Sequence, residues 1–274
     1  MPTALITGAS RGIGRATALH LDALGWRVLA GYRDPADAEA LGAAASDRLT
    51  PIPLDLTTPD DLRAAANAVA AGGLDALVNN AGIVVAGPLE FLPLDAIREQ
   101  FEVNVFGTVA LTQAMIPALR AARGRIVNVS SVNGEIVTPF AVPYAASKFA
   151  LEAFTDGWRL ELRRDGIVTI SIQPGAIATP LWETSRTRAV LLAASYPPEA
   201  RERYGRVLAL LEAARMPARA IPPERVARLI ATVLRRRRPR ARYVIGRDAR
   251  IGLLLRTLLP TRWFDALLAG RRRA

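Results

Sequence analysis

The sequence has no cysteine and only one histidine, His20, among its 274 residues. Without cysteine the chain can form no disulfide, no thiolate-ligated metal site and no cysteine nucleophile. A single imidazole cannot by itself build a zinc site or a serine triad. His20 lies in the helical pattern "RATALHLDALG", where we expect it to pack against its neighbours. The composition therefore predicts no resident metal ion and excludes thiol chemistry.

Long apolar runs are missing as well, although 51% of the residues are hydrophobic. No run of about eighteen uninterrupted apolar residues occurs, so we expect no membrane-spanning helix. The first residues also lack a basic region followed by an apolar stretch and a cleavage site. There is enough apolar material for a large core, and we expect an ordered, soluble, cytoplasmic protein.

Negative charge is scarce in the last quarter of the chain. Residues 1–200 contain 16 cations and 20 acids, a net charge of −4, whereas residues 201–274 contain 20 cations and 5 acids, a net charge of +15. Such a basic segment can contact nucleic acid or an anionic membrane, but a solvated surface is the default interpretation. Because the segment has neither a recognised nucleic-acid motif nor a row of stacking aromatic residues, we expect no nucleic-acid partner.

Lysine is almost absent. All but one of the 36 cationic residues are arginine, and the exception is Lys148, four residues after Tyr144. A guanidinium group is a planar fork, whereas an ammonium group is a compact point charge on a thin stem. A site that has to place one small positive charge beside a phenol would reject arginine. The pair is therefore a candidate functional site.

What the chain does contain is a regular alternation of short apolar runs and longer helical patterns. The apolar runs predict buried strands at residues 3–7, 27–32, 49–54, 74–79, 124–130, 167–173 and 241–246. Helical patterns lie between them at residues 14–25, 59–71, 95–122, 144–165 and 223–235. Such alternation produces βαβ units, so the predicted fold class is α/β, with a single doubly wound parallel sheet of about seven strands and helices on both faces.

Two segments depart from this rhythm. Residues 180–222 contain prolines and patterns of short helices directly after a predicted strand, where open α/β sheets bind ligands. We interpret them as a substrate-binding insertion in a catalytic domain of residues 1–248. Residues 249–274 form a basic, amphipathic C-terminal extension.

A glycine-rich turn follows the first predicted strand in "LITGASRGIGRATA". Gly8 permits a tight turn, Gly12 lets the backbone approach a pyrophosphate, and Gly14 lets helix and strand pack closely. The start of the following helix supplies amide donors and the positive end of a dipole. A lone glycine motif is weak, but a strand before it and a helix after it support a dinucleotide-binding turn.

The spacing of this turn, together with "NNAG" at 79–82, "VNVSS" at 127–131, "YAASK" at 144–148 and "PG" at 174–175, resembles the short-chain dehydrogenase/reductase family. The motifs match in order from residue 3 to about 180, and the likeness in fold extends to about residue 246. "YAASKFALEAF" and "PGAIATPLW" are most similar to the branch that contains hydroxysteroid and retinol dehydrogenases. The resemblance implies a Rossmann-like fold and an oxidoreductase that uses a nicotinamide cofactor.

The resemblance gives the Tyr144–Lys148 pair a chemical purpose. Residues four apart share a helix face, so the ammonium should favour the phenolate and lower the pKa of the phenol, which is near 10 when unperturbed. The phenol can then exchange a proton with a carbonyl or alcohol oxygen. By resemblance Ser131 stabilises charge on the substrate oxygen, and Asn104 holds a water that links the lysine to solvent.

The resemblance also implies a set of cofactor-binding residues. Tyr144 and Lys148 belong to it because the lysine binds the nicotinamide ribose, Asp55 caps the adenine amine, and Thr179 contacts the carboxamide. The full set is Gly8, Ser10, Arg11, Gly12, Ile13, Gly14, Tyr32, Arg33, Asp55, Leu56, Asn80, Ala81, Gly82, Tyr144, Lys148, Pro174, Gly175, Ile177 and Thr179.

Charges at the end of the second predicted strand favour NADP(H) over NAD(H). An NAD site places an acid there for the ribose 2′-hydroxyl, but the corresponding residue is the uncharged Tyr32. Arg33 follows it, and Arg11 lies in the glycine turn, so both can pair with a 2′-phosphate. Asp34 is the argument for NAD; because it precedes Pro35, we interpret it as the N-cap of the next helix.

The substrate and the partners are less closely defined. The insertion has many apolar residues, which suits a small lipophilic ketone, aldehyde or alcohol, although ordinary helix packing explains them about as well. We favour packing of the C-terminal extension over the active site or at a subunit interface, with an anionic membrane surface as the alternative. A homodimer or homotetramer is expected. The rival function is a non-catalytic dinucleotide-binding sensor or scaffold, but such a protein has no need of the tyrosine acid.

Overall fold

The computed structural model describes residues 1–269, and the last five residues of the predicted extension lie outside this range. Seven strands form one parallel sheet in the order β3-β2-β1-β4-β5-β6-β7. The strands are β1 (Thr3–Ile6), β2 (Arg27–Tyr32), β3 (Leu49–Pro53), β4 (Ala76–Asn79), β5 (Arg125–Val129), β6 (Val168–Pro174) and β7 (Arg242–Ile245). The predicted fold class is confirmed, and every strand lies within two residues of its expected position.

Helices cover both faces of the sheet. Apolar side chains of α1 (Gly12–Ala23), α2 (Pro35–Gly42) and α9 (Pro223–Arg235) pack in the core on one face. Those of α3 (Pro59–Ala70), α5 (Thr108–Ala122) and α6 (Val142–Glu161) pack on the other. Strands that are buried from both sides need apolar residues in succession, and β1 and β4 are buried at all of their positions.

Among the described residues, one helical run is long and apolar enough to cross a membrane, by length and composition alone. It extends over Leu94–Ala122 and comprises α4 (Leu94–Phe101), a π-helical turn (Glu102–Gly107) and α5, with a mean hydropathy of 1.3 in its most apolar window. Leu111, Met115 and Leu119 of this run are fully buried in the core beneath the sheet. Packing within the fold therefore accounts for its apolar character.

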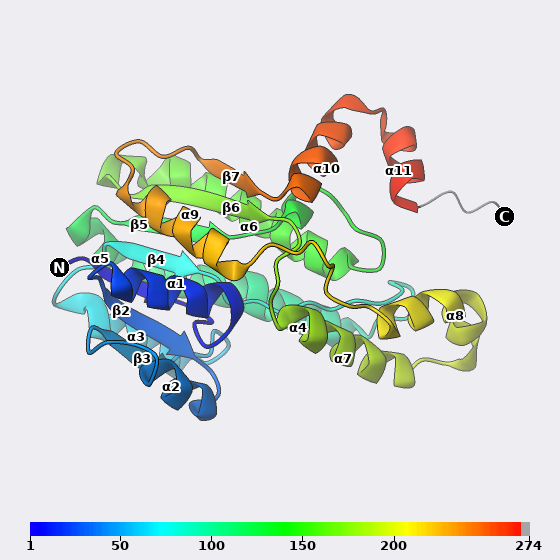
Figure 1. Ribbon diagram of the computed structural model, residues 1–274, viewed down its shortest axis with the longest axis horizontal. Helices are drawn as coiled ribbons and strands as arrows, with labels where there is room; N and C mark the ends of the chain where they lie inside the picture. The colour runs from blue at the N-terminus through cyan, green and yellow to red at the C-terminus, as the bar shows by residue number, and fades with distance from the viewer. Residues whose placement is uncertain (270–274) are drawn as a thin grey trace.

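The strand order reverses between β1 and β4, and in open α/β sheets ligands bind outside the carboxyl ends of the strands at such a point. Figure 1 shows α4, α7 (Leu181–Ala194), α8 (Pro198–Glu212) and α10 (Arg247–Leu258) gathered beyond those strand ends. The last helix, α11 (Thr261–Ala269), follows α10. The expectation of short helices in residues 180–222 is wrong, because α7 and α8 have 14 and 15 residues.

Candidate active site

Tyr144 and Lys148 lie one turn apart on α6 and meet as the sequence predicted. The Lys148 ammonium lies 5.8 Å from the centroid of the Tyr144 ring. The lysine is buried, and its Nζ donates to the carbonyl oxygen of Val129 at the end of β5, 2.9 Å away. A thin ammonium stem fits this enclosed position, where a planar fork would need more room.

Ser131 follows β5 and begins a 3-10 turn (Val132–Gly134). Its Oγ accepts a hydrogen bond from the Asn133 amide at 3.1 Å, so the serine caps the turn that leads toward α6. The Ser131 hydroxyl also lies near the Tyr144 phenol and lowers the pKa of that phenol. Ser131, Tyr144 and Lys148 therefore lie together at the carboxyl edge of the sheet.

The expected effect of the lysine on the phenol is not found. Burial raises the pKa of Tyr144 above its ordinary value, and the nearby Ser131 hydroxyl only partly opposes this rise. The reason is that enclosure disfavours a phenolate, and spacing along a helix does not reveal that enclosure. Burial also lowers the pKa of Lys148, to about 8, against the opposing charge of Glu152.

Asn104 lies in the π-helical turn and is buried. Its amide side chain accepts from the backbone N–H of Ile83 at 2.8 Å and donates to the Ile83 carbonyl at 3.0 Å and to Ser147 Oγ at 3.1 Å. Ser147 precedes Lys148, so Asn104 ties the segment after β4 to α6. π-Turns of this kind occur frequently at functional sites.

The turn between β1 and α1 has no room for side chains at its three glycine positions. Gly8 and Gly12 have φ values of +60° and +53°, and a Cβ on Gly12 would lie 3.0 Å from Thr179 Cγ2. A Cβ on Gly14 would collide with the Gly8 carbonyl oxygen and lie 2.5 Å from Asn80 Nδ2. The close approach of helix and strand that was expected of Gly14 is therefore present.

Asn80 connects the end of β4 to the glycine turn. Its Nδ2 donates to the carbonyl oxygens of Thr7 and Gly8 at 3.0 and 3.1 Å, while Thr7 Oγ1 accepts from the amides of Asn80 and Ala81. Next to them, a Cβ on Gly82 would lie 3.2 Å from Asn104 Oδ1. These contacts hold the two loops at the switch point in a fixed relation.

The adenine end of the predicted site lies after β3. Asp55 Oδ1 accepts from the amide and hydroxyl of Thr57 at 2.8 and 2.7 Å, and its own amide donates to Asp61. Leu56 is buried. A Cβ added to Gly107 in the π-turn would lie only 2.5 Å from the Leu56 carbonyl oxygen, so the two backbones approach closely. These contacts involve one carboxylate oxygen of Asp55 and fix the direction of the group.

The loop after β6 carries Pro174, Gly175, Ile177 and Thr179. Ile177 is buried and pairs with Ile221 just before α9. Asp248, near the start of α10, accepts from the Ala176 amide at 2.8 Å and leaves no room for a side chain on Gly175. Asp248 was not among the predicted site residues, because 72 residues separate it from Ala176 and only the fold brings them together.

The residues expected to choose the cofactor lie at the end of β2. Tyr32 is half-buried, Arg33 is exposed, and Asp34 accepts from the Ala36 amide at 3.1 Å as the predicted N-cap of α2. Arg11 was expected to be open to a phosphate, but its Nε and Nη2 donate to Asp37 Oδ1 at 3.2 and 3.1 Å. No signal in the sequence pointed to Asp37, which lies 26 residues from Arg11.

These residues together fit a bound dinucleotide. The glycine turn leads into the start of α1, whose first backbone N–H groups can bind a pyrophosphate, and Tyr144 with Lys148 follows β5 at the same carboxyl edge of the sheet. Ser10 and Ile13 lie in the same turn and first helical turn and are half-buried.

The insertion packs on the segment that follows β4. Tyr196 and Leu208 are buried against Val85 and Leu92, which agrees with ordinary helix packing for these two residues. Leu191 and Leu210 remain exposed. On the other side, α10 contacts the turn after Ser131, and a Cβ on Gly252 would lie 3.1 Å from Ile136 Cδ1.

Comparison with known proteins agrees with this geometry. A family model described as short chain dehydrogenase matches residues 2–189. Retinol dehydrogenase 5 of Mus musculus is 37% identical, with 96% of this chain and 86% of that protein covered. A crystal structure of a short-chain dehydrogenase from Streptomyces avermitilis superposes with a TM-score of 0.78 at 29% identity and 99% coverage of both chains. Another, from Burkholderia cenocepacia J2315 in complex with NADP, gives a TM-score of 0.76 at 27% identity and 98% coverage of both. The chain belongs to the short-chain dehydrogenase/reductase family of oxidoreductases, in its retinol and hydroxysteroid dehydrogenase-like branch.

Proposed function

We propose that the protein uses NADP(H) to interconvert a lipophilic ketone or aldehyde with its alcohol, with Tyr144 as the proton donor and acceptor. The observation that carries the proposal is the buried lysine beside the Tyr144 phenol, with the Ser131 hydroxyl close enough to lower the pKa of that phenol. A protein that only sensed a dinucleotide would have no need of that arrangement.

In the reductive direction the Tyr144 hydroxyl gives its proton to the substrate oxygen. Ser131 donates a hydrogen bond to the same oxygen while negative charge develops on it. The Lys148 ammonium stabilises the phenolate that remains. The cofactor, when bound, supplies or accepts the hydride. Since burial raises the pKa of Tyr144, the phenol holds its proton at neutral pH and is ready to donate it.

The proposed preference for NADP(H) rests on the charges at the end of β2 and on similarity to a solved structure. The residue at the end of β2 is Tyr32 rather than an acid, and Arg33 is exposed beside it. A structural neighbour at 27% identity is described as a complex with NADP. For Arg11 to bind a 2′-phosphate, the phosphate has to replace Asp37 as its partner.

A lipophilic substrate is supported by the insertion and by the relatives. Leu181, Val190 and Leu191 on α7 are exposed beyond the strand ends, and the most similar relatives include a retinol dehydrogenase. The test is NADPH oxidation across steroids, retinoids, long-chain aldehydes and quinones. Turnover of at least one class supports the function, whereas cofactor binding without turnover of any class favours the sensor.

We also propose that α10 and α11 rest on an anionic membrane surface. Ile251, Leu254 and Leu258 share one side of α10 and are 50%, 57% and 68% exposed. Only the opposite side of α10, which contacts the turn after Ser131, is packed against the protein. On α11, Trp263 and Leu267 are exposed one turn apart. An amphipathic segment with tryptophan and arginine suits a lipid headgroup region.

Charge favours lipid over a second copy of the chain as the occupant of this surface. Residues 247–269 contain four arginines and two acids, and one of the acids, Asp248, is turned toward the Ala176 amide. A two-fold interface would place the same arginines close to each other, which is repulsive. Anionic headgroups would instead pair with them.

A further inference from the structure

A line of polar residues continues along α6 beyond the proposed catalytic pair. Tyr144, Lys148, Glu152 and Asp156 follow one another at intervals of four, which places them along one side of the helix. Glu152 is buried, with 7% of its side chain exposed, one turn from the buried Lys148. A carboxylate in such a position is costly unless it is paired and hydrogen-bonded.

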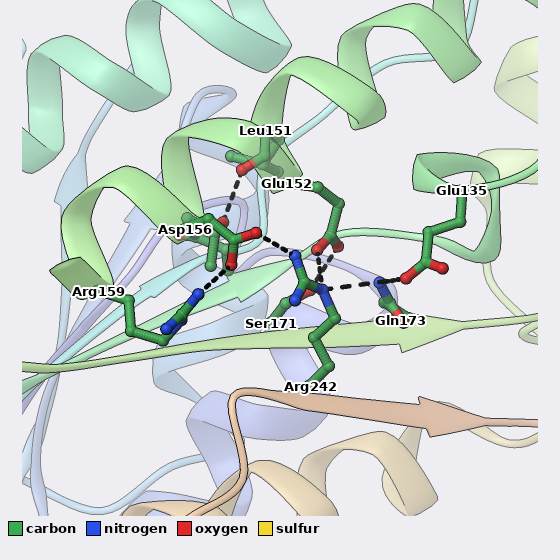
Figure 2. A network of polar contacts seen from close by, with 10 residues as sticks. Glu135, Leu151, Glu152, Asp156, Arg159, Ser171, Gln173 and Arg242 are labelled. Atoms are coloured by element: carbon green, nitrogen blue, oxygen red, sulfur yellow. Dashed lines mark hydrogen bonds and ion pairs between the residues drawn. The ribbon is translucent and has the colours of Figure 1, made fainter.

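Glu152 is held by the two strands that α6 covers. Ser171 on β6 donates to Glu152 Oε1 at 2.5 Å, and Arg242 on β7 donates through Nε to Oε2 at 3.0 Å. Ser171 and Arg242 are register partners in the parallel sheet, so both reach the helix from adjacent positions. Figure 2 shows the carboxylate of Glu152 above the guanidinium of Arg242, with Ser171 beside it.

Arg242 has further acidic partners. Its Nη2 donates to Asp156 Oδ2 at 2.6 Å, and its Nε lies 3.9 Å from Glu135 Oε1, which accepts from Gln173. The guanidinium therefore keeps a counter-charge of its own when Glu152 is changed. Asp156 binds the same arginine one turn further from Lys148.

The turn that carries Ser131 rests directly on Glu152. A Cβ on Gly134 would lie 2.9 Å from Glu152 Cγ, 3.0 Å from Ser130 Oγ and 3.2 Å from the Lys148 carbonyl oxygen. Glu152 thus contacts the strand partners on one side and the serine turn on the other. Few substitutions other than isosteric ones would preserve these contacts.

We propose that Glu152, fixed by Ser171 and Arg242 one helix turn from Lys148, is a positioning residue that keeps the Lys148 ammonium charged beside Tyr144. The inference rests on the proposed function, because it assigns Glu152 a role only through Lys148.

The charges around Lys148 support this role. On α6 the ionisable neighbours are Tyr144, Glu152 and Asp156; Glu135 lies after the 3-10 turn and Arg242 on β7. The buried neutral polar groups of α6, β5 and its end, β6 and the π-turn include Ser130, Ser131, Ser147, Ser171, Gln173 and Asn104. Burial lowers the pKa of Lys148 to about 8, and Glu152 is the group that raises it. Without this carboxylate the lysine would lose its proton at a lower pH.

The single lysine makes the test direct. Protein labelled with [6-13C]lysine gives one Lys148 signal, whose titration reports its pKa without turnover. The variant Glu152→Gln should lower this pKa by about one pH unit, as expected for removal of a charge one helix turn away at the effective dielectric of a protein interior. Asp156→Asn, which breaks a contact with the same arginine, should leave it nearly unchanged. The alkaline limb of kcat/KM should move with the titration.

A second variant keeps the inference testable if Glu152→Gln fails to fold. Arg242→Gln removes the positive charge beside Glu152 and should raise the pKa of Lys148, the opposite sign. Equal shifts of the Lys148 pKa in Glu152→Gln and Asp156→Asn, or no shift of this pKa in any variant, would overturn the inference. So would an alkaline limb of kcat/KM that does not move with the Lys148 titration. Full activity of Tyr144→Phe would instead overturn the proposed function and leave the titration result unaffected.

Discussion

At the scale of single residues, burial governs both members of the candidate proton-transfer pair. It raises the pKa of Tyr144 and lowers that of Lys148, so it pushes both groups toward their neutral forms. A neutral phenol suits proton donation, but a neutral lysine could not stabilise the phenolate that follows. Lys148 therefore needs support from a nearby negative charge.

The variant Lys148→Arg keeps a positive charge but should reduce kcat about 100-fold or more. The ammonium stem is enclosed, and its Nζ points at the Val129 carbonyl, so a wider guanidinium group would be displaced from the phenol. Steady-state kinetics and thermal unfolding of both proteins separate lost activity from lost stability. Activity within a few-fold of wild type would mean that the one lysine in the chain has no special purpose.

The variant Tyr32→Asp should move the preference from NADP toward NAD. The carboxylate could accept from a ribose 2′-hydroxyl but would repel a 2′-phosphate near Arg33 and Arg11. Loss of one charge-assisted contact costs roughly 1.5–3 kcal/mol, so a shift of about one to two decades in relative kcat/KM is expected. The measurement is kcat/KM with both cofactors. A wild-type enzyme that already prefers NAD would contradict the roles given to the two arginines.

At the scale of elements, the glycine turn and α6 offer a matched pair of substitutions. Gly14→Ala would press a methyl group against the Gly8 carbonyl, and backbone cannot yield cheaply. We expect a loss of about 1–3 kcal/mol in the free energy of unfolding, and weaker cofactor binding. Gly157→Ala, on α6 with open space around it, should instead stabilise by about 0.5–1 kcal/mol.

Denaturant unfolding and NADPH titration measure both effects. If Gly14→Ala is as stable as wild type and binds cofactor equally well, the close contact of α1 with β1 does not shape the cofactor site. The Gly157→Ala variant shows in the same experiment what an added methyl group does in an unconstrained helix.

The elements could be predicted from the sequence because each has a local signal. Strands buried from both sides are short apolar runs, and the glycines at 8, 12 and 14 mark the turn between β1 and α1. The long α7 and α8 were missed because prolines were taken as breaks, whereas Pro198 lies at the first position of α8, where proline is tolerated. The π-turn around Asn104 could not be predicted from the sequence. It lies directly between α4 and α5, so the helical sequence pattern continues on both sides of it.

The parts of the site that escaped prediction depend on distant contacts. Arg11 meets Asp37, and Ala176 meets Asp248, only after the chain has folded. The direction of the Tyr144 pKa depends on enclosure by several elements, whereas four-residue spacing reports only that Tyr144 and Lys148 share a helix face. Spacing thus locates the reactive groups, and packing sets their charge.

At the scale of the whole molecule, the exposed side of α10 should anchor the protein to anionic vesicles. Replacing Ile251, Leu254 and Leu258 together by serine should reduce binding to phosphatidylcholine–phosphatidylglycerol vesicles by more than about tenfold, because burying each side chain is worth about 1.5 kcal/mol or more. Co-sedimentation gives the measurement. Leu160→Ser, at a residue of α6 that is 67% exposed, is the control. Equal binding of the triple variant and wild type, or no binding of either, would contradict the membrane proposal.

The central claim is that this fold carries out hydride chemistry with Tyr144 as its acid, and one comparison tests it most directly. The measurement is NADPH-dependent reduction of an accepted carbonyl substrate by wild type and by Tyr144→Phe, with the cofactor Kd determined for both. Removing one hydroxyl leaves the ring and the fold in place, so Kd should stay within about twofold while kcat falls by about 100- to 10,000-fold. A Tyr144→Phe variant with near-normal kcat would contradict the account.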